Sequence, residues 1–170
     1  AIAAPVEPAS MSVFNVANGQ QVFDGNSVQF GQVNIGSSNN NTLSIANAGP
    51  GELEIGQITL AGPGAGDYSF TLIGNPIAPV SSGSLAIAFS PTAAGVRQAV
   101  MTIPNNDPDQ PSFSLILSGT GVQPAAPVMQ VRVNGNAVAA NGQFAFGNVE
   151  LGDSATANVE LRNVGNAALN

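Results

Sequence analysis

The stretch Phe30-Gly31-Gln32-Val33-Asn34-Ile35-Gly36 returns 116 positions later as Phe146-Gly147-Asn148-Val149-Glu150-Leu151-Gly152. The spacing then continues without a gap, pairing Leu43 with Val159, Ile45 with Leu161, Asn47 with Asn163 and Gly49 with Gly165. A period of this length is the size of a domain and exceeds the roughly 20–50 residues of solenoid repeats. The sequence therefore predicts one complete domain followed by the opening part of a second domain of the same type.

Composition excludes several classes of function. Of the 170 residues, 44% are hydrophobic, which is enough for a core, and only 8% are charged. The net charge is −7, and the three cations are all Arg, too few to neutralise the phosphates of a nucleic acid or to bind an anionic membrane. No apolar run approaches about 18 residues, so we predict no membrane insertion. The chain has no Cys and no His, which excludes disulfides, thiolate metal sites and Ser–His catalysis.

Beyond Ser10, short runs of alternating apolar and polar residues are separated by Gly, Pro, Asn and Asp, as in strands joined by turns. The predicted strands are Met11–Val16, Ser27–Val33, Asn41–Asn47, Leu53–Leu60, Tyr68–Ile73, Ser84–Phe89, Arg97–Ile103 and Ser112–Ser118. Strands of this number and length predict an all-β, immunoglobulin-like β-sandwich without helices. The alternation also predicts a core containing Leu43, Ile45, Leu85, Ile87, Phe89, Met101, Phe113, Leu115 and Leu117.

The chain divides into four predicted segments. An extended arm or linker over residues 1–9 precedes the complete sandwich at 10–122, and a Pro-containing linker at 123–127 precedes the incomplete second sandwich at 128–170. A half-domain of about 43 residues cannot easily bury its apolar side chains alone. Either the natural chain continues through another period to about residue 238, or a neighbouring chain completes the sheet by strand addition, with Ala1–Ala9 as a candidate donor.

Seven short motifs occur in order along the first domain. They are Phe30-Gly31-x-Val33-x-x-Gly36, Leu43-x-Ile45-x-Asn47-x-Gly49, Leu53-x-Ile55-x-x-Ile58, Gly66-Asp67-Tyr68-Ser69-Phe70, Phe89-Ser90-Pro91-Thr92-x-x-Gly95, Ile103-Pro104-Asn105-Asn106-Asp107-Pro108-Asp109 and Leu117-Ser118-Gly119-Thr120-Gly121. Together they resemble the ASH type of immunoglobulin-like domain, named for abnormal-spindle and hydin proteins and related to major sperm protein. The bacterial version in choice-of-anchor D surface proteins is the most similar. The resemblance implies a seven-stranded sandwich for protein–protein contact or spacing, often in tandem and without catalytic residues.

Calcium is the one metal for which the sequence offers ligands, because it binds carboxylate and carbonyl oxygens. The candidates are Asp107 and Asp109, with Asn106 nearby. The same residues suit a side-chain-to-backbone turn around Pro108, and the family resemblance implies that use. We therefore expect a turn, with no bound metal and no other cofactor.

Two further patterns were weighed as sites. Glu52 and Glu54 share one face of a predicted strand and could serve glycoside chemistry, but exposed carboxylates on strands are far more common than catalytic pairs. We therefore predict that the protein is not an enzyme. The triplet Asn40-Asn41-Thr42 is a formal glycosylation sequon, which a chain rich in Asn, Ser and Thr produces by chance.

The sequence favours a non-catalytic structural or interaction module of an exported bacterial surface or extracellular-matrix protein. The start at Ala1 without Met suits a processed secreted protein, or a fragment, and the chain has no Lys. The expected partners are proteins, including copies of the chain itself, in a tandem array or filament. The alternative is a carbohydrate- or ligand-binding adhesion module, although stacking aromatics are scarce, with no Trp and only Tyr68 as tyrosine.

Overall fold

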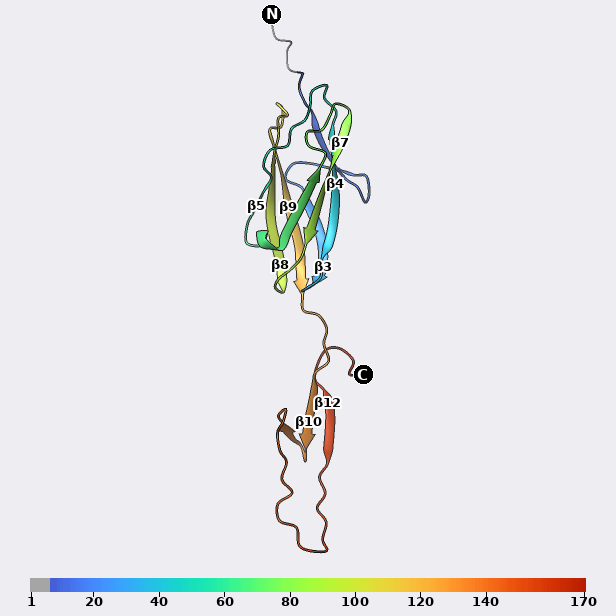
Figure 1. Cartoon of the computed structure of the whole chain (residues 1–170), viewed down its shortest axis with the longest axis vertical. Helices are drawn as coiled ribbons and strands as arrows, with labels where there is room; N and C mark the ends of the chain where they lie inside the picture. The colour runs from blue at the N-terminus through green and yellow to red at the C-terminus, as the bar shows by residue number, and fades with distance from the viewer. Residues whose placement is uncertain (1–6) are drawn as a thin grey trace, which may run out of the picture. The chain divides into compact units, whose positions relative to one another are not determined.

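The computed structural model describes residues 7–170, which form two compact units that divide between Gln123 and Pro124 (Figure 1). Most of the N-terminal arm, residues 1–6, lies outside the described part, and so does its predicted role as a donor strand. Among residues 7–170, no helix has the length and apolarity that a membrane crossing requires. The two units are described separately below.

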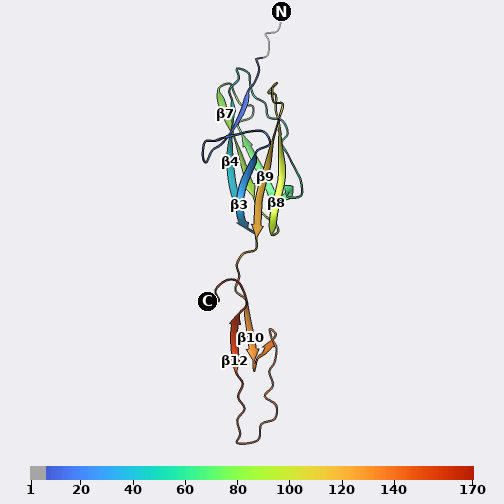
Figure 2. The ribbon, with the colours of Figure 1, turned by 180° about the vertical axis from the view of Figure 1, so that it is seen from behind.

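The first unit consists of two sheets. The five-stranded sheet has the order β2 (Gln21–Val22), β1 (Met11–Asn15), β4 (Asn39–Asn47), β7 (Ser81–Phe89) and β6 (Tyr68–Ile73), and every neighbouring pair is antiparallel. The four-stranded sheet has the order β3 (Ser27–Asn34), β9 (Ser112–Val122), β8 (Gly95–Pro104) and β5 (Thr59–Ala61). The pair β3–β9, seen from behind in Figure 2, is parallel. One 3-10 turn, η1 (Ala65–Asp67), is the helical element of this unit. The prediction of an all-β, immunoglobulin-like sandwich is confirmed.

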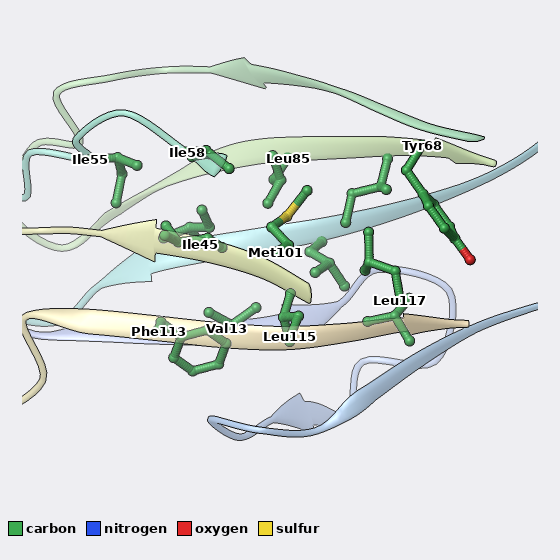
Figure 3. Packing of buried hydrophobic residues seen from close by; sticks show 14 of the residues in the cluster. Val13, Ile45, Ile55, Ile58, Tyr68, Leu85, Met101, Phe113, Leu115 and Leu117 are labelled. Atoms are coloured by element: carbon green, nitrogen blue, oxygen red, sulfur yellow. The ribbon is translucent and has the colours of Figure 1, made fainter. Parts of the chain in front are cut away.

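The core lies between the two sheets, as Figure 3 shows for Leu85 and Ile45 from one sheet and Met101 and Leu115 from the other. All nine residues predicted to face inward are buried, because alternate residues of a strand point to the same face. Three aromatic rings close one end of this core. Tyr68 stacks on Phe89 with ring centroids 4.9 Å apart, and Phe30 meets Tyr68 edge-on at 5.5 Å.

The predicted strand Leu53–Leu60 is wrong. The segment makes only isolated bridges, Leu53 with Ile77 and Ile55 with Asn105, before the short β5 begins at Thr59. Leu53, Ile55 and Ile58 are buried, so the alternation is real, but the segment passes from the side of one sheet to the other instead of joining a ladder. An alternation of apolar and polar residues indicates which side chains are buried, but it does not show that the segment forms hydrogen bonds with a neighbouring strand.

The boundaries of the first unit also differ from those predicted. Ala9 is buried, and the Pro8 carbonyl accepts a hydrogen bond from the Gly51 N–H at 3.2 Å, so the sandwich begins before Ser10. In the predicted linker, Ala126 exchanges hydrogen bonds with Asn166 in the second unit. The connection between the units is therefore shorter than residues 123–127.

The second unit repeats part of the first sheet in the same register. Its strands are β10 (Met129–Val133), β11 (Asn136–Val138) and β12 (Val159–Asn163), in the order β11-β10-β12. The β1–β4 ladder runs from Met11↔Asn47 to Asn15↔Leu43, and the β10–β12 ladder runs from Met129↔Asn163 to Val133↔Val159. The order β11-β10-β12 thus corresponds to β2-β1-β4.

This correspondence extends the repeat to a hairpin that the sequence comparison missed. Val13 pairs with Val22 in the first unit, and Val131 pairs with Val138 in the second, so the second hairpin is two residues shorter. Its turn is Asn134-Gly135, with φ of 48° and 81°. These positive values suit the tight two-residue hairpins that Asn-Gly favours. Because the second hairpin is two residues shorter, equivalent residues of β1 and β10 are not 116 positions apart like those from Phe30 and Phe146 onward. A comparison at the fixed spacing of 116 therefore misses the similarity of the two hairpins.

Candidate functional site

The loop between β8 and β9 contains the predicted calcium ligands, and it uses the first of them as a backbone acceptor. Asp107 is buried, and its Oδ2 accepts a hydrogen bond from the Met11 N–H at 2.7 Å. Its Oδ1 accepts another from the Asp109 N–H at 2.9 Å, which is an Asx-turn around Pro108. Both carboxylate oxygens thus accept hydrogen bonds from backbone N–H groups of the protein.

The acidic residues near this loop are not arranged as a metal site. Within residues 7–170, no group of three or more His, Cys, Asp or Glu residues is placed to hold a metal ion. Asp109 is exposed, and Asn106 turns its side chain to a neighbouring loop instead. Its Oδ1 accepts from the Glu54 N–H at 2.9 Å, and its Nδ2 donates to the Glu52 carbonyl at 3.0 Å. The side chain of Asn106 therefore links the loop between β8 and β9 to the segment that contains Glu52 and Glu54.

Glu52 and Glu54, the pair considered for glycoside chemistry, line a hollow of about 490 Å³. Its lining comprises Glu7, Pro8, Ala9, Gly51, Glu52, Glu54, Asn106 and Pro108. Both Glu52 and Glu54 are exposed to solvent. Their backbone groups make the contacts with Asn106 described above.

A buried ionic cluster, which the sequence reasoning did not single out, lies where η1 meets β6. The carboxylate of Asp67 accepts hydrogen bonds from the Thr92 N–H at 3.0 Å and the Thr92 hydroxyl at 2.7 Å, and it contacts the Arg97 guanidinium. Burial by itself raises the pKa of this carboxyl, but the Thr92 hydrogen bonds and the Arg97 guanidinium outweigh burial and lower the pKa below its usual value. The only sequence signal was the Gly66-Asp67-Tyr68 motif, whose partners lie 25–30 positions away.

Tyr68 extends the same cluster. Its hydroxyl donates to the Arg97 carbonyl at 2.8 Å. Burial, together with the negative charge of Asp67, raises the pKa of the Tyr68 phenol to about 12. A perturbed pKa can mark a catalytic group, but here each shifted group has hydrogen-bond partners that join β6, β8 and the loop after β7. The arrangement holds the sandwich together.

A second buried side chain, Asn47, ends β4 and is matched in the second unit. Its Oδ1 accepts from the N–H groups of Ser10 and Gly49 at 3.2 and 3.0 Å, and its Nδ2 donates to the Gly51 carbonyl at 2.7 Å. Asn163 repeats all three contacts: its Oδ1 accepts from Val128 and Gly165, and its Nδ2 donates to the Ala167 carbonyl. The strands β4 and β12 therefore end with the same set of side-chain-to-backbone hydrogen bonds.

Glycine is required beside each of these asparagines. A Cβ on Gly49 would overlap the backbone of Pro8 and Ala9, and a Cβ on Gly165 would overlap that of Ala126 and Val128. The sequence repeat included both Asn and Gly, but their backbone partners, in the segments just before β1 and β10, became visible only in the folded chain.

The strand β12 has a single neighbour among the described residues, unlike its counterpart β4. In the first unit, β4 lies between β1 and β7, whereas within residues 7–170 β12 pairs only with β10. Leu43 and Ile45 of β4 are 0% exposed. Their counterparts in β12, Val159 and Leu161, are 59% and 65% exposed.

The backbone groups of β12 alternate between the side that faces β10 and the opposite side. The Val164 N–H donates to the Val128 carbonyl at 2.8 Å, and the Asn134 N–H donates to the Asn158 carbonyl at 2.9 Å. Residues 158 and 164 thus direct their backbone groups toward the β10 side. Because successive residues alternate sides in an antiparallel ladder, Val159, Leu161 and Asn163 direct theirs toward the opposite side.

Comparison with protein families gives a match to the ASH model (Abnormal spindle-like microcephaly-assoc'd, ASPM-SPD-2-Hydin) over residues 20–113, more than half of the chain. The predicted resemblance to ASH domains is thereby confirmed, while the closeness to choice-of-anchor D proteins stays a prediction. A search of curated proteins gave no match.

Several solved structures are similar to the chain, and two of them are described here. One is a protein of unknown function from Porphyromonas gingivalis W83, with a TM-score of 0.55 and 19% identity over 70% of this chain. The chain spans 50% of that protein's length. The other is the ASH/PapD-like domain 7 of human CEP192, with a TM-score of 0.46 and 12% identity, covering 73% of this chain and 97% of that domain. At such identities, the first similarity supports the fold alone.

Proposed function

Because this chain belongs to the ASH family of immunoglobulin-like domains, we propose that it is a structural module of an exported bacterial surface or extracellular-matrix protein. The ASH domain is a non-catalytic interaction module. In the proposed function, the module makes protein–protein contacts that build a tandem array or a filament. It resembles the repeated domains of choice-of-anchor D proteins in this role.

The observation that carries the proposal is the recurrence of one strand register in both units. The β1–β4 ladder and the β10–β12 ladder pair equivalent residues, and Asn47 and Asn163 end the equivalent strands with equivalent hydrogen bonds. A unit that recurs at a regular interval along the chain is the basis of tandem and filamentous assemblies.

The surface of the first unit also suits protein contact. Arg97 is the single charged residue within its strands, and its guanidinium is engaged by Asp67. The outward faces of the two sheets therefore carry Ser, Thr, Ala, Asn and Gln in place of charges. The cores of protein–protein interfaces are depleted of charged residues because burial of an unpaired charge is costly.

Exposure on intact cells would test the exported role. Antibodies raised against residues 10–122 should bind cells that produce the protein, and brief external protease treatment should remove that binding. The expected result is binding without permeabilisation, together with self-association of the purified chain in light scattering. Binding only after lysis would contradict export, and a strictly monomeric chain would contradict self-assembly.

A second candidate function, carbohydrate adhesion, has one observation in its favour. Phe70 is 36% exposed and is one of the residues that line a hollow of about 310 Å³, together with polar residues of β4 and β6 and the apolar segment 86–88 of β7. Sugar rings stack on exposed aromatics, which also bury apolar surface. A glycan array with the unaltered chain and with Phe70→Ala would test this role, because specific binding should disappear in the variant.

A further inference from the structure

We propose that Asn134 is a site of spontaneous covalent modification, at which the side-chain amide is lost and the main chain is rearranged. Asn134 and Gly135 form the two-residue turn between β10 and β11. Both residues are exposed to solvent, and the space beside Gly135 is open. The reaction consumes only water, so it is independent of the proposed assembly.

The reaction takes place between the two residues of the turn. The backbone nitrogen of Gly135 gives its proton to solvent and attacks Cγ of Asn134. As the N–Cγ bond forms, the Cγ–Nδ2 bond breaks, and the amide nitrogen takes a proton from water and leaves as ammonia. Glycine favours this ring closure because it has no side chain beside the attacking nitrogen. Water then opens the cyclic imide at either carbonyl and leaves aspartate or isoaspartate.

The attacking nitrogen is more available in this turn than at the other Asn-Gly pairs of the chain. The N–H of Gly19 donates to the Asn15 carbonyl at 2.8 Å, and the N–H of Gly142 donates to the Ala139 carbonyl at 2.8 Å. Within residues 7–170, the N–H of Gly135 has no protein acceptor. A hydrogen-bonded N–H must give up its bond before it loses its proton, so the reaction is favoured at Gly135.

The side-chain carbonyl of Asn134 is activated by a hydrogen bond from the segment that leads into β12. Its Oδ1 accepts from the Asn158 N–H at 2.9 Å. A donor at this oxygen stabilises the negative charge that develops there as the nitrogen attacks Cγ, as donors in an oxyanion hole do. In the described part of the chain, the leaving Nδ2 group has no acceptor, whereas Nδ2 of Asn18 donates to Gln20 Oε1 at 3.3 Å.

The complete first unit shows that this position does not depend on any further strand. There the Val16 N–H donates to the Thr42 carbonyl at 3.0 Å, in the same way as the Asn134 N–H donates to the Asn158 carbonyl at 2.9 Å. Residues 16–20, which follow β1, are exposed although both sheets of that unit are present. Asn134 therefore occupies an exposed turn of the fold, and the second unit has an amide where the first has Val16.

Isoaspartate would disrupt the hairpin that the turn now closes. It carries the main chain through the side-chain methylene carbon, which lengthens the connection between Val133 and Asn136, the last pair of the β10–β11 ladder. The turn has φ of 48° at Asn134 and 81° at Gly135, values that match the twist of the flanking strands. A longer connection changes this geometry, and we expect β11 to separate from β10.

Peptide mapping of the folded 170-residue chain after storage at neutral pH would test the proposal. The tryptic fragment 133–162 contains both Asn134 and Asn141, which fragment ions separate, and Asn18 lies in another fragment. Mass spectrometry detects the exchange of the amide NH2 for OH, and water labelled with heavy oxygen marks each opened imide. Asn134 should react at least about fivefold faster than Asn18 or Asn141, because the N–H that follows it is not hydrogen-bonded.

Storage in urea separates the effect of the fold from that of the Asn-Gly dipeptide. In the unfolded chain the protecting hydrogen bonds are absent, so the three sites should react at rates within about twofold of one another. Equal rates at Asn134 and Asn141 in the folded chain would overturn the proposal, since both lie in the second unit. A preference for Asn134 that persists in urea would also overturn it, because the turn would then have no part in the reaction.

Hydrogen exchange measures the consequence for the hairpin. In the isoaspartate form, purified by chromatography, the amides of residues 136–138 should exchange at least about fivefold faster than in the fresh chain. Asn134→Asp is the matched control, because it adds the same charge without lengthening the main chain, and it should keep exchange within about twofold of the fresh chain. Equal exchange in the isoaspartate form and the fresh chain would overturn the separation of β11 from β10.

Discussion

The carboxylate of Asp107 accepts a hydrogen bond from the backbone N–H of Met11 at 2.7 Å, although the two residues lie 96 positions apart. The first residue of β1 is thereby held to the loop between β8 and β9, so that one side chain links the two sheets at this end of the sandwich. The same carboxylate orders its own loop through the Asp109 N–H. A residue weighed as a calcium ligand thus has a structural role.

We predict that Asp107→Ala lowers the free energy of unfolding by about 1.5–3 kcal/mol, because it leaves the buried N–H of Met11 and the partly buried N–H of Asp109 without a charged acceptor. Urea unfolding monitored by circular dichroism would measure the loss. Asp109→Ala is the matched control, since Asp109 is exposed and contributes its N–H rather than its carboxylate. A loss in the control as large as that in Asp107→Ala would contradict this account.

Removal of calcium should not change stability. Both oxygens of Asp107 are already hydrogen-bonded to protein N–H groups, and calcium needs several oxygen ligands at once. Thermal melts with added calcium and with a chelator should therefore have the same midpoint. A midpoint that rises with calcium and falls with the chelator would establish a metal site in this loop.

The Asp67 cluster predicts a loss of stability in acid. The folded-state pKa of Asp67 is lowered below the reference value of 3.8, so its ionised form stabilises the fold fully above that value. This contribution is lost as the pH falls below 3.8 and through the lowered folded-state pKa. The difference in unfolding free energy between the unaltered chain and Asp67→Asn should therefore shrink across that range. A difference that stays constant from neutral pH into strong acid would contradict the lowered pKa.

Tyr68 allows a direct titration, because it is the only tyrosine of the chain. Burial and the Asp67 charge raise its pKa from 10.0 to about 12, so tyrosinate absorbance should appear near pH 12 while the chain is folded. The associated stability is fully present below pH 10 and is lost as the pH rises through about 12. Circular dichroism on the same samples confirms folding. A midpoint near 10 in a folded chain would show that the phenol is accessible to solvent.

Phe89→Ala should destabilise the first unit by about 3–5 kcal/mol, because it leaves a cavity where Phe89 contacts Phe30 and Tyr68. Denaturant unfolding would measure this cost. Phe70→Ala removes an aromatic ring of the same size from an exposed position of β6 and should cost less than about 1 kcal/mol. Similar losses in the two variants would show that the end of the core is not packed around Phe89.

Much of the fold could be predicted from local patterns. Alternation in strands such as β7 and β9 identified Leu85, Phe89 and Leu115 as core residues, because a strand turns alternate side chains to one face whatever its partner. The spacing of 116 residues likewise identified Asn163 as the counterpart of Asn47. These features depend on residue order alone.

The pairing of the strands was decided only by the tertiary structure. The parallel pair β3–β9, the passage of Leu53–Ile58 between the sheets, and the contacts of Asp107 with Met11 and of Asp67 with Arg97 join segments that are far apart in the chain. A hydrogen-bonding partner at such a separation is chosen by how the whole chain closes, and the same short motif is compatible with several partners.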